Sequence, residues 1–153
     1  IKKLKKMKKI LITGSEGFIG QKMSLFYVNK KLNVYGSYYK NKIKKIKGVK
    51  YIKCNFKRKF EIESLINKIK PNYIFHLAAK SHPIYSFKNP ISTVQTNFIG
   101  TFYLLNAIKK LKLNTKIIIA GSSAQFGIKK LKELPVSEKA NCNPEHIYGS
   151  QKK

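Results

Sequence analysis

Three glycines in the pattern G-x-x-G-x-x-G separate an apolar run from a helical pattern near the start of the chain. Residues 9–13 are largely apolar and lead into Gly14, and residues 17–29 then carry apolar side chains at helical spacing. Glycines in such a strand–turn–helix connection allow a sharp turn and bring main-chain N–H groups against a pyrophosphate at the helix N-terminus. An ordinary glycine turn is the alternative, but the flanking strand and helix favour a dinucleotide site. Its predicted residues are Gly14, Gly17, Phe18, Ile19 and Gly20.

Further apolar runs predict strands at residues 33–37, 49–54, 73–77 and 116–120. Helical spacing covers residues 61–69, and a long helix is expected to begin at Pro90. Strands that alternate with helices require a parallel sheet with helices on both faces. The expected fold is therefore α/β, a doubly wound sheet of the Rossmann type, truncated after the fifth strand and the start of a last helix. We expect the fifth strand, which is nearly all Ile, to be covered on both faces.

The chain is expected to form one domain. Residues 1–6, which precede Met7, are interpreted as an upstream basic extension, and residues 7–153 as an NAD(P)-binding domain that lacks its C-terminal substrate-binding region. No apolar run approaches the roughly 18 residues that a membrane span needs, so no membrane contact is expected. Cys54 and Cys142 form no C-x-x-C pair, which predicts neither a disulfide nor a metal site and favours the cytoplasm.

The formal net charge of +27 raises the question of nucleic-acid binding. Arg58 is the only arginine, whereas proteins that recognise phosphates and bases rely on the planar guanidinium fork. We interpret the charge as a solvated coat of lysines and expect no nucleic-acid partner. A basic nucleic-acid-binding module remains the non-enzyme alternative, and lysines clustered on a single face would support it.

The choice between NAD and NADP is normally made at the end of the second strand, where an acidic side chain binds the ribose 2′-hydroxyl. Residues 36–40 contain Ser37 but no carboxylate, and Lys40 or Lys42 offers a cation to a 2′-phosphate. The sequence thus favours NADP over NAD, unless these lysines belong to the general coat.

The ends of the next two strands add contacts for a dinucleotide. Asn55 and Phe56 follow the third strand, where an amide side chain can hydrogen-bond an adenine edge. After the fourth strand, small residues allow the main chain to pass close to a cofactor, and the predicted contacts are Leu77, Ala78 and Ala79. His76 is interpreted as a packed structural histidine.

The reactive groups follow the fifth strand. Tyr148 and Lys152 are one helical turn apart, so they share a helix face, and an adjacent ammonium favours the phenolate of a tyrosine. Ser122 can hydrogen-bond a substrate oxygen while Tyr148 transfers a proton and a nicotinamide exchanges hydride. Tyr148 and Lys152 are also predicted to contact the cofactor. Ser123 has either a substrate contact or a structural role.

Five segments together resemble the extended short-chain dehydrogenase/reductase family, also called NAD-dependent epimerase/dehydratase. They are residues 13–20, 76–79, 97–101, 122–127 and 148–152. The resemblance implies a catalytic triad of Ser122, Tyr148 and Lys152, a cofactor contact at Asn97, and a protein that assembles as a homodimer or homotetramer.

Three other stretches, residues 79–82, 86–90 and 134–138, most resemble GDP-mannose 4,6-dehydratases and GDP-4-keto-6-deoxymannose reductases. This resemblance implies a GDP-linked sugar as substrate, with Ser81 and His82 as candidate contacts. The dehydratases carry Glu two residues after the catalytic Ser or Thr, but this chain has Ala124 there. We therefore expect reduction of a GDP-4-keto-6-deoxy sugar, with dehydration or epimerisation as the alternative. The 153-residue chain by itself is expected to be inactive.

Overall fold

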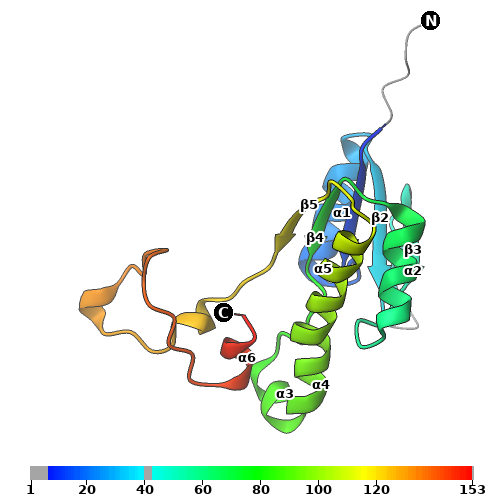
Figure 1. The fold of residues 1–153 in the computed structure, drawn as a ribbon. Helices are drawn as coiled ribbons and strands as arrows, with labels where there is room; N and C mark the ends of the chain where they lie inside the picture. The colour runs from blue at the N-terminus through cyan, green and yellow to red at the C-terminus, as the bar shows by residue number, and fades with distance from the viewer. Residues whose placement is uncertain (1–6, 40–42, 153) are drawn as a thin grey trace, which may run out of the picture.

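A computed structural model describes residues 7–39 and 43–152 and contains a five-stranded parallel sheet (Figure 1). The strand order is β3-β2-β1-β4-β5: the first three strands are added toward one edge of the sheet and the last two toward the other edge, as in a doubly wound fold. In the central register, Leu11 of β1 pairs with Tyr35 of β2 and Ile74 of β4. The strands are β1 (Lys9–Thr13), β2 (Asn33–Tyr38), β3 (Val49–Lys53), β4 (Tyr73–His76) and β5 (Lys116–Ile119). The predicted fold class is confirmed.

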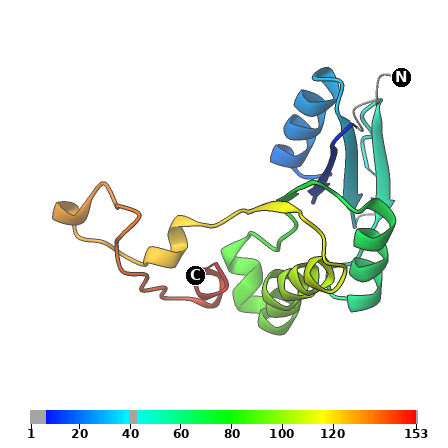
Figure 2. The same cartoon turned by 45° about the horizontal axis from the view of Figure 1, so that its top comes forward.

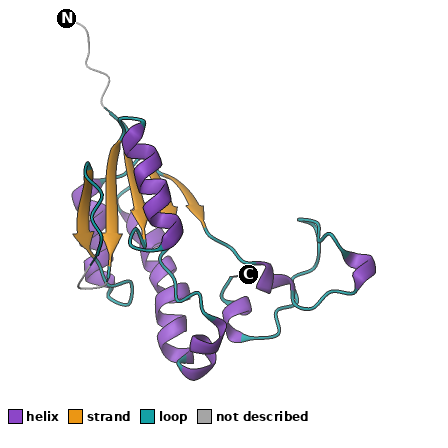
Figure 3. Ribbon diagram, turned by 180° about the vertical axis from the view of Figure 1, so that it is seen from behind, coloured by secondary structure: helices purple, strands orange, loops and turns teal. Residues whose placement is uncertain are grey.

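Two apolar layers lie on opposite faces of the sheet because successive strand side chains alternate. Ile10 and Ile12 of β1 pack with α1 (Phe18–Asn29) on one face. Leu11, between them, packs on the other face with α2 (Lys59–Ile69) and α5 (Gly100–Lys110). Figures 2 and 3 show α1 on one side of the strands and α2 with α5 on the other.

The long helix expected from Pro90 is present as three consecutive segments. It begins with α4 (Pro90–Val94), continues through a π-helical stretch η1 (Gln95–Ile99), and ends in α5. A π-helical stretch inside an α-helix often marks a functional position, and this one contains Asn97. A short preceding helix, α3 (Pro83–Lys88), was not expected from the sequence.

The expectation that β5 is covered on both faces is wrong for the described residues. Ile118 is 62% exposed and Ile119 is 43% exposed. After β5 the chain leads away from the sheet through the short 3₁₀ helices η2 (Ser123–Phe126) and η3 (Leu131–Glu133), and then reaches α6 (Ile147–Ser150) beside α3 (Figure 2). None of the described helices is both long and apolar enough to cross a bilayer.

Candidate dinucleotide and catalytic cleft

A cleft of about 720 Å³ opens at the carboxyl ends of the strands. Ligands of open α/β sheets bind at this edge, beside the point where the strand order reverses. The glycine loop, the residues that follow β2, β3 and β4, and α6 contribute to its walls. Fourteen residues predicted from the sequence line it: Gly14, Gly17, Phe18, Ile19, Gly20, Ser37, Asn55, Phe56, Leu77, Ala78, Ala79, Ser81, Tyr148 and Lys152.

The glycine loop is shaped by close approaches of the main chain. Gly14 has φ +65°, and a Cβ there would lie 3.0 Å from the Ala78 main chain. A Cβ on Gly20 would clash with the carbonyl oxygen of Gly14 and would approach the Ser15 Cα to 2.8 Å. The main-chain N–H and hydroxyl of Ser15 both donate to the Ser37 carbonyl oxygen, at 3.0 and 2.9 Å, which fixes the loop to β2. Main chain therefore approaches main chain closely at Gly14 and Gly20, which leaves backbone N–H groups available to a pyrophosphate at the start of α1.

A buried hydrogen-bond chain supports the loop after β4. The Thr101 hydroxyl donates to the Asn97 carbonyl oxygen at 2.6 Å, so it accepts from Nε2–H of His76 at 2.9 Å. His76 Nδ1 therefore accepts from the Thr13 hydroxyl at 2.8 Å, and that hydroxyl oxygen accepts from the N–H groups of Leu77 and Ala78. Burial, together with the charge of Lys152, lowers the pKa of His76 to about 4. The structural role predicted for His76 is confirmed.

Asn97 lies behind the cleft wall and not in its lining. Its Oδ1 accepts from the Lys80 N–H at 2.7 Å, and its Nδ2 donates to the Lys80 carbonyl oxygen at 3.1 Å and to Gln151 Oε1 at 3.0 Å. The side chain is buried within the π-helical stretch. Asn97 thereby joins the loop after β4 to the turn that follows α6, next to Lys152.

Tyr148 and Lys152 enter the cleft from the short helix α6 and the turn after it. Tyr148 is 8% exposed, and its ring stacks on His146 with a centroid distance of 6.2 Å. The Lys152 ammonium donates to the Ala120 carbonyl oxygen, just beyond β5, at 2.7 Å. Burial lowers the pKa of Lys152.

Ser122 occupies the turn that packs against α6. A Cβ on Gly149 would come within 2.5 Å of the Ala124 carbonyl oxygen, so this glycine allows α6 to lie directly against that turn. The Ser122 hydroxyl accepts from the Ala124 N–H at 3.2 Å and is not in the cleft lining. Ser123 and His82 are exposed and also lie outside the lining. Lys40 and Lys42 lie outside the described residues.

Sequence reasoning missed a carboxylate at the end of β2. Glu16, inside the glycine motif, lines the cleft, and its Oε1 accepts from the Tyr39 N–H at 3.0 Å. The prediction of NADP considered only residues 36–40, which contain no carboxylate, whereas in the folded chain Glu16 reaches Tyr39 in this stretch. The sequence signal for such a carboxylate was the acidic residue within the glycine motif itself.

The cleft also contains groups that the sequence did not point to. Lys80 places its ammonium over the rings of Tyr39 and Tyr85, at 5.7 and 5.2 Å from their centroids. Lys57 lines the cleft and donates to the Ser92 hydroxyl at 2.8 Å. Burial, with a smaller contribution from Glu61, raises the pKa of Cys54 to about 12, which keeps its thiol protonated near neutral pH. The described residues contain no group of three or more His, Cys, Asp or Glu side chains able to hold a metal ion.

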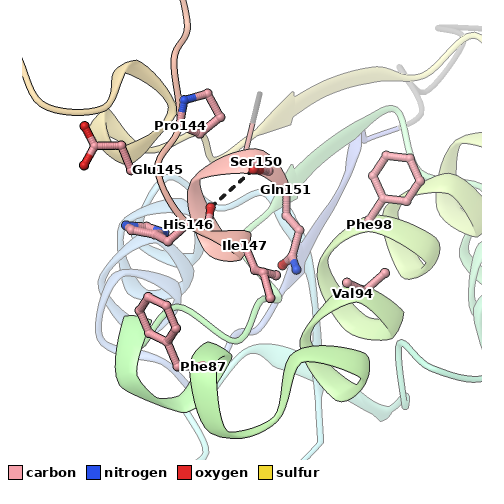
Figure 4. A pocket seen from close by; sticks show the side chains of 9 residues that line it. All are labelled: Phe87, Val94, Phe98, Pro144, Glu145, His146, Ile147, Ser150 and Gln151. Carbon is pink, nitrogen blue, oxygen red and sulfur yellow. Dashed lines mark hydrogen bonds between the residues drawn. The ribbon is translucent and has the colours of Figure 1, made fainter.

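A second, open groove of about 500 Å³ lies between α6 and the helices α3 and α4 (Figure 4). Its apolar walls include Phe87, Val94, Phe98 and Ile147. On the α6 side, the hydroxyl of Ser150 donates to the His146 carbonyl oxygen at 3.3 Å. These walls are mainly apolar and do not include the glycine loop. The groove is therefore separate from the chemistry of the larger cleft.

Comparison with known proteins agrees with this geometry. A family model described as GDP-mannose 4,6 dehydratase matches residues 11–153. The chain is 30% identical to dTDP-D-glucose 4,6-dehydratase of Dictyostelium discoideum, over 95% of the chain and 38% of that protein. It is 27% identical to GDP-mannose 4,6-dehydratase of Vibrio cholerae, over 93% of the chain and 42% of that protein.

Solved structures share the fold. UDP-glucose 4-epimerase of Thermus thermophilus, in complex with NAD, superposes with a TM-score of 0.85 at 22% identity. The superposition covers 94% of the chain and 47% of the epimerase. The chain thus spans less than half the length of each of these three proteins.

Proposed function

The chain belongs to the GDP-mannose 4,6 dehydratase family, among nucleotide-sugar dehydratases and epimerases with an NAD-binding fold, and on this premise we propose that its protein modifies a nucleotide sugar with a bound NAD or NADP. The observation that carries the proposal is that one cleft is lined both by the glycine loop and by the Tyr148 and Lys152 side chains. A dinucleotide bound at the glycine loop would then lie in the same cleft as the proposed proton-transferring group. The remaining substrate contacts are proposed to come from a C-terminal region.

The residues proposed to hold the dinucleotide act through shape and main-chain donors. The glycine loop would receive the pyrophosphate, since side chains at Gly14 and Gly20 would fill the cradle or clash with its walls. Ser37, Asn55, Phe56 and the segment from Leu77 to Ala79 would surround the adenosine and its neighbouring groups. When bound, the nicotinamide supplies or accepts the hydride.

Side chains of this chain are proposed to carry out the proton transfer. Tyr148 is proposed to give or take the proton of the sugar hydroxyl, and the Lys152 ammonium to stabilise the phenolate that results. Ser122 is proposed to hydrogen-bond the sugar oxygen. Its hydroxyl accepts from the Ala124 N–H and keeps its own hydrogen free to donate to that oxygen. Ser81 is a candidate sugar contact because it lines the cleft.

We favour reduction of a GDP-4-keto-6-deoxy sugar because Ala124 cannot move the second proton that elimination of water requires. The second candidate is 4,6-dehydration or epimerisation, which the matched family model and the named relatives support. A homodimer or homotetramer in the cytoplasm is the proposed form of the protein. Light scattering coupled to gel filtration tests the assembly.

The experiment that separates the two reactions is a cofactor balance. The protein is incubated with GDP-4-keto-6-deoxymannose and either NADH or NADPH, and in parallel with GDP-mannose and a trace of NAD⁺ or NADP⁺. Reduction predicts one reduced dinucleotide consumed per product in the first mixture. Turnover of GDP-mannose with no net change in the dinucleotide would instead establish dehydration or epimerisation.

A further inference from the structure

We propose that Glu16 binds the adenosine ribose of the dinucleotide and selects NAD over NADP. The inference rests on the proposed function of the cleft as a dinucleotide site. Glu16 belongs to the glycine loop, yet its side chain reaches the residue that follows β2. Its Oε1 accepts from the Tyr39 N–H at 3.0 Å, and β2 ends at Tyr38.

The main chain on both sides of the Glu16 side chain is held in place by hydrogen bonds. The Gln21 side chain donates to the Glu16 carbonyl oxygen at 2.8 Å, which fixes the main chain of the loop. The preceding residue, Ser15, is buried and donates twice to the Ser37 carbonyl oxygen of β2. The loop and the strand end therefore form one rigid unit, and Glu16 bridges them.

One carboxylate oxygen still needs a hydrogen-bond donor. Glu16 Oε2 is shielded from water and has no hydrogen-bond partner among the described residues. A buried acceptor without a donor is costly, and a ligand hydroxyl beside it would relieve that cost. The ribose 2′-hydroxyl is such a donor, and acidic groups at the end of the second strand bind it in dinucleotide folds.

The same carboxylate disfavours a 2′-phosphate. The phosphate carries no spare donor for Glu16 near neutral pH, and it brings a negative charge close to another one. Lys80 is a competing cation, since its ammonium lies 5.7 Å from the centre of the Tyr39 ring. If Lys80 instead received a 2′-phosphate, its removal would weaken NADP⁺ binding more than NAD⁺ binding.

The test is calorimetric titration of the protein with NAD⁺ and with NADP⁺. We expect the protein to bind NAD⁺ about tenfold more tightly than NADP⁺, and Glu16→Gln to reduce that ratio to about threefold or less. Lys80→Ala is expected to leave the ratio within about twofold of its original value. Glu133→Gln is the matched control, because this exposed carboxylate lies outside the cleft lining and the charge change is the same.

Equal or tighter binding of NADP⁺ by the unaltered protein would overturn the inference and leave the dinucleotide site intact. An unchanged ratio in Glu16→Gln would overturn it as well. Since the first comparison uses no variant, it holds even if a substitution disturbs folding. Binding of neither dinucleotide would overturn the proposed function and the inference with it.

Discussion

The Lys152 ammonium donates a hydrogen bond to the Ala120 carbonyl oxygen at 2.7 Å, which ties the turn after α6 to the chain just beyond β5. Lys152 is 32 residues from Ala120 in the sequence, and the segment between them leads away from the sheet (Figure 2). The bond therefore fixes both the position of Lys152 in the cleft and the return of the chain to it. Burial at this position lowers the pKa of Lys152.

Replacing Lys152 tests whether its proposed catalytic role distinguishes it from the solvated lysines of the surface. Lys152→Met removes an ammonium from the cleft that Tyr148 also lines, and we expect turnover to fall by about 100-fold, the range typical of a lost acid–base component. Lys132→Met, on an exposed 3₁₀ turn, is the control and should retain full turnover. Steady-state assays with the nucleotide sugar measure both. Full activity of Lys152→Met would remove this residue from the mechanism.

His76 should make the stability of the fold depend on pH. In the unfolded chain its imidazole takes up a proton as the pH falls through about 6.5, whereas burial delays this to about 4 in the folded chain. The unfolded state thus binds the proton first, and folded stability falls as the pH drops from 6.5 towards 4. We expect the titration of His76 to lower the free energy of unfolding by about 2 kcal/mol between pH 7 and pH 5, as measured by urea unfolding. His76→Gln should flatten this part of the profile, and an equally steep profile would contradict the assignment.

Two glycines in the cleft should respond differently to the same substitution. Gly20→Ala drives a methyl group into the Gly14 carbonyl oxygen, and we expect a loss of about 1–3 kcal/mol in the free energy of unfolding. The methyl group of Gly121→Ala would have no atom within 4 Å, so this variant should change the free energy of unfolding by less than about 0.5 kcal/mol. Chemical denaturation of both variants gives the comparison. Similar losses would show that the glycine loop is not tightly packed.

Much of the fold was predictable because its signals are local. The glycine motif, the apolar strands and the helix after Pro90 each depend on neighbouring residues, and the structure reproduces them. The exposure of Ile118 and Ile119 was not predictable, since an Ile-rich run indicates a strand but not which elements cover it. The helix α3 was missed because it is short and lacks a long periodic pattern.

The site was predicted less completely because its key contacts join distant segments. The glycine loop, Tyr148 and Lys152 were identified as motifs, and they line one cleft. The bond from Tyr39 to Glu16 spans 23 residues, and no spacing rule foretells it. Asn97 was named from a family resemblance, but its place behind the wall depends on Lys80 and Gln151.

The Asn97→Ala variant tests whether dinucleotide binding depends on the support that Asn97 gives to the loop after β4. Asn97→Ala leaves the Lys80 main chain without its partners, and we expect a cost of about 1–3 kcal/mol in the free energy of unfolding. The affinity for a dinucleotide should also fall, by about tenfold, because the loop after β4 loses its support. Gln95→Ala, exposed in the same π-helical stretch, is the control. Unchanged affinity in Asn97→Ala would show that the loop keeps its position without this contact.

The central claim is that Tyr148 transfers the proton while a dinucleotide bound in the same cleft exchanges hydride with a nucleotide sugar. The most direct measurement compares the protein with its Tyr148→Phe variant, using turnover of the nucleotide sugar and dinucleotide affinity together, with Tyr103→Phe outside the cleft as control. The account predicts a fall of about 100-fold or more in turnover for Tyr148→Phe, with dinucleotide affinity within about threefold of the original. Undiminished turnover in Tyr148→Phe would contradict it.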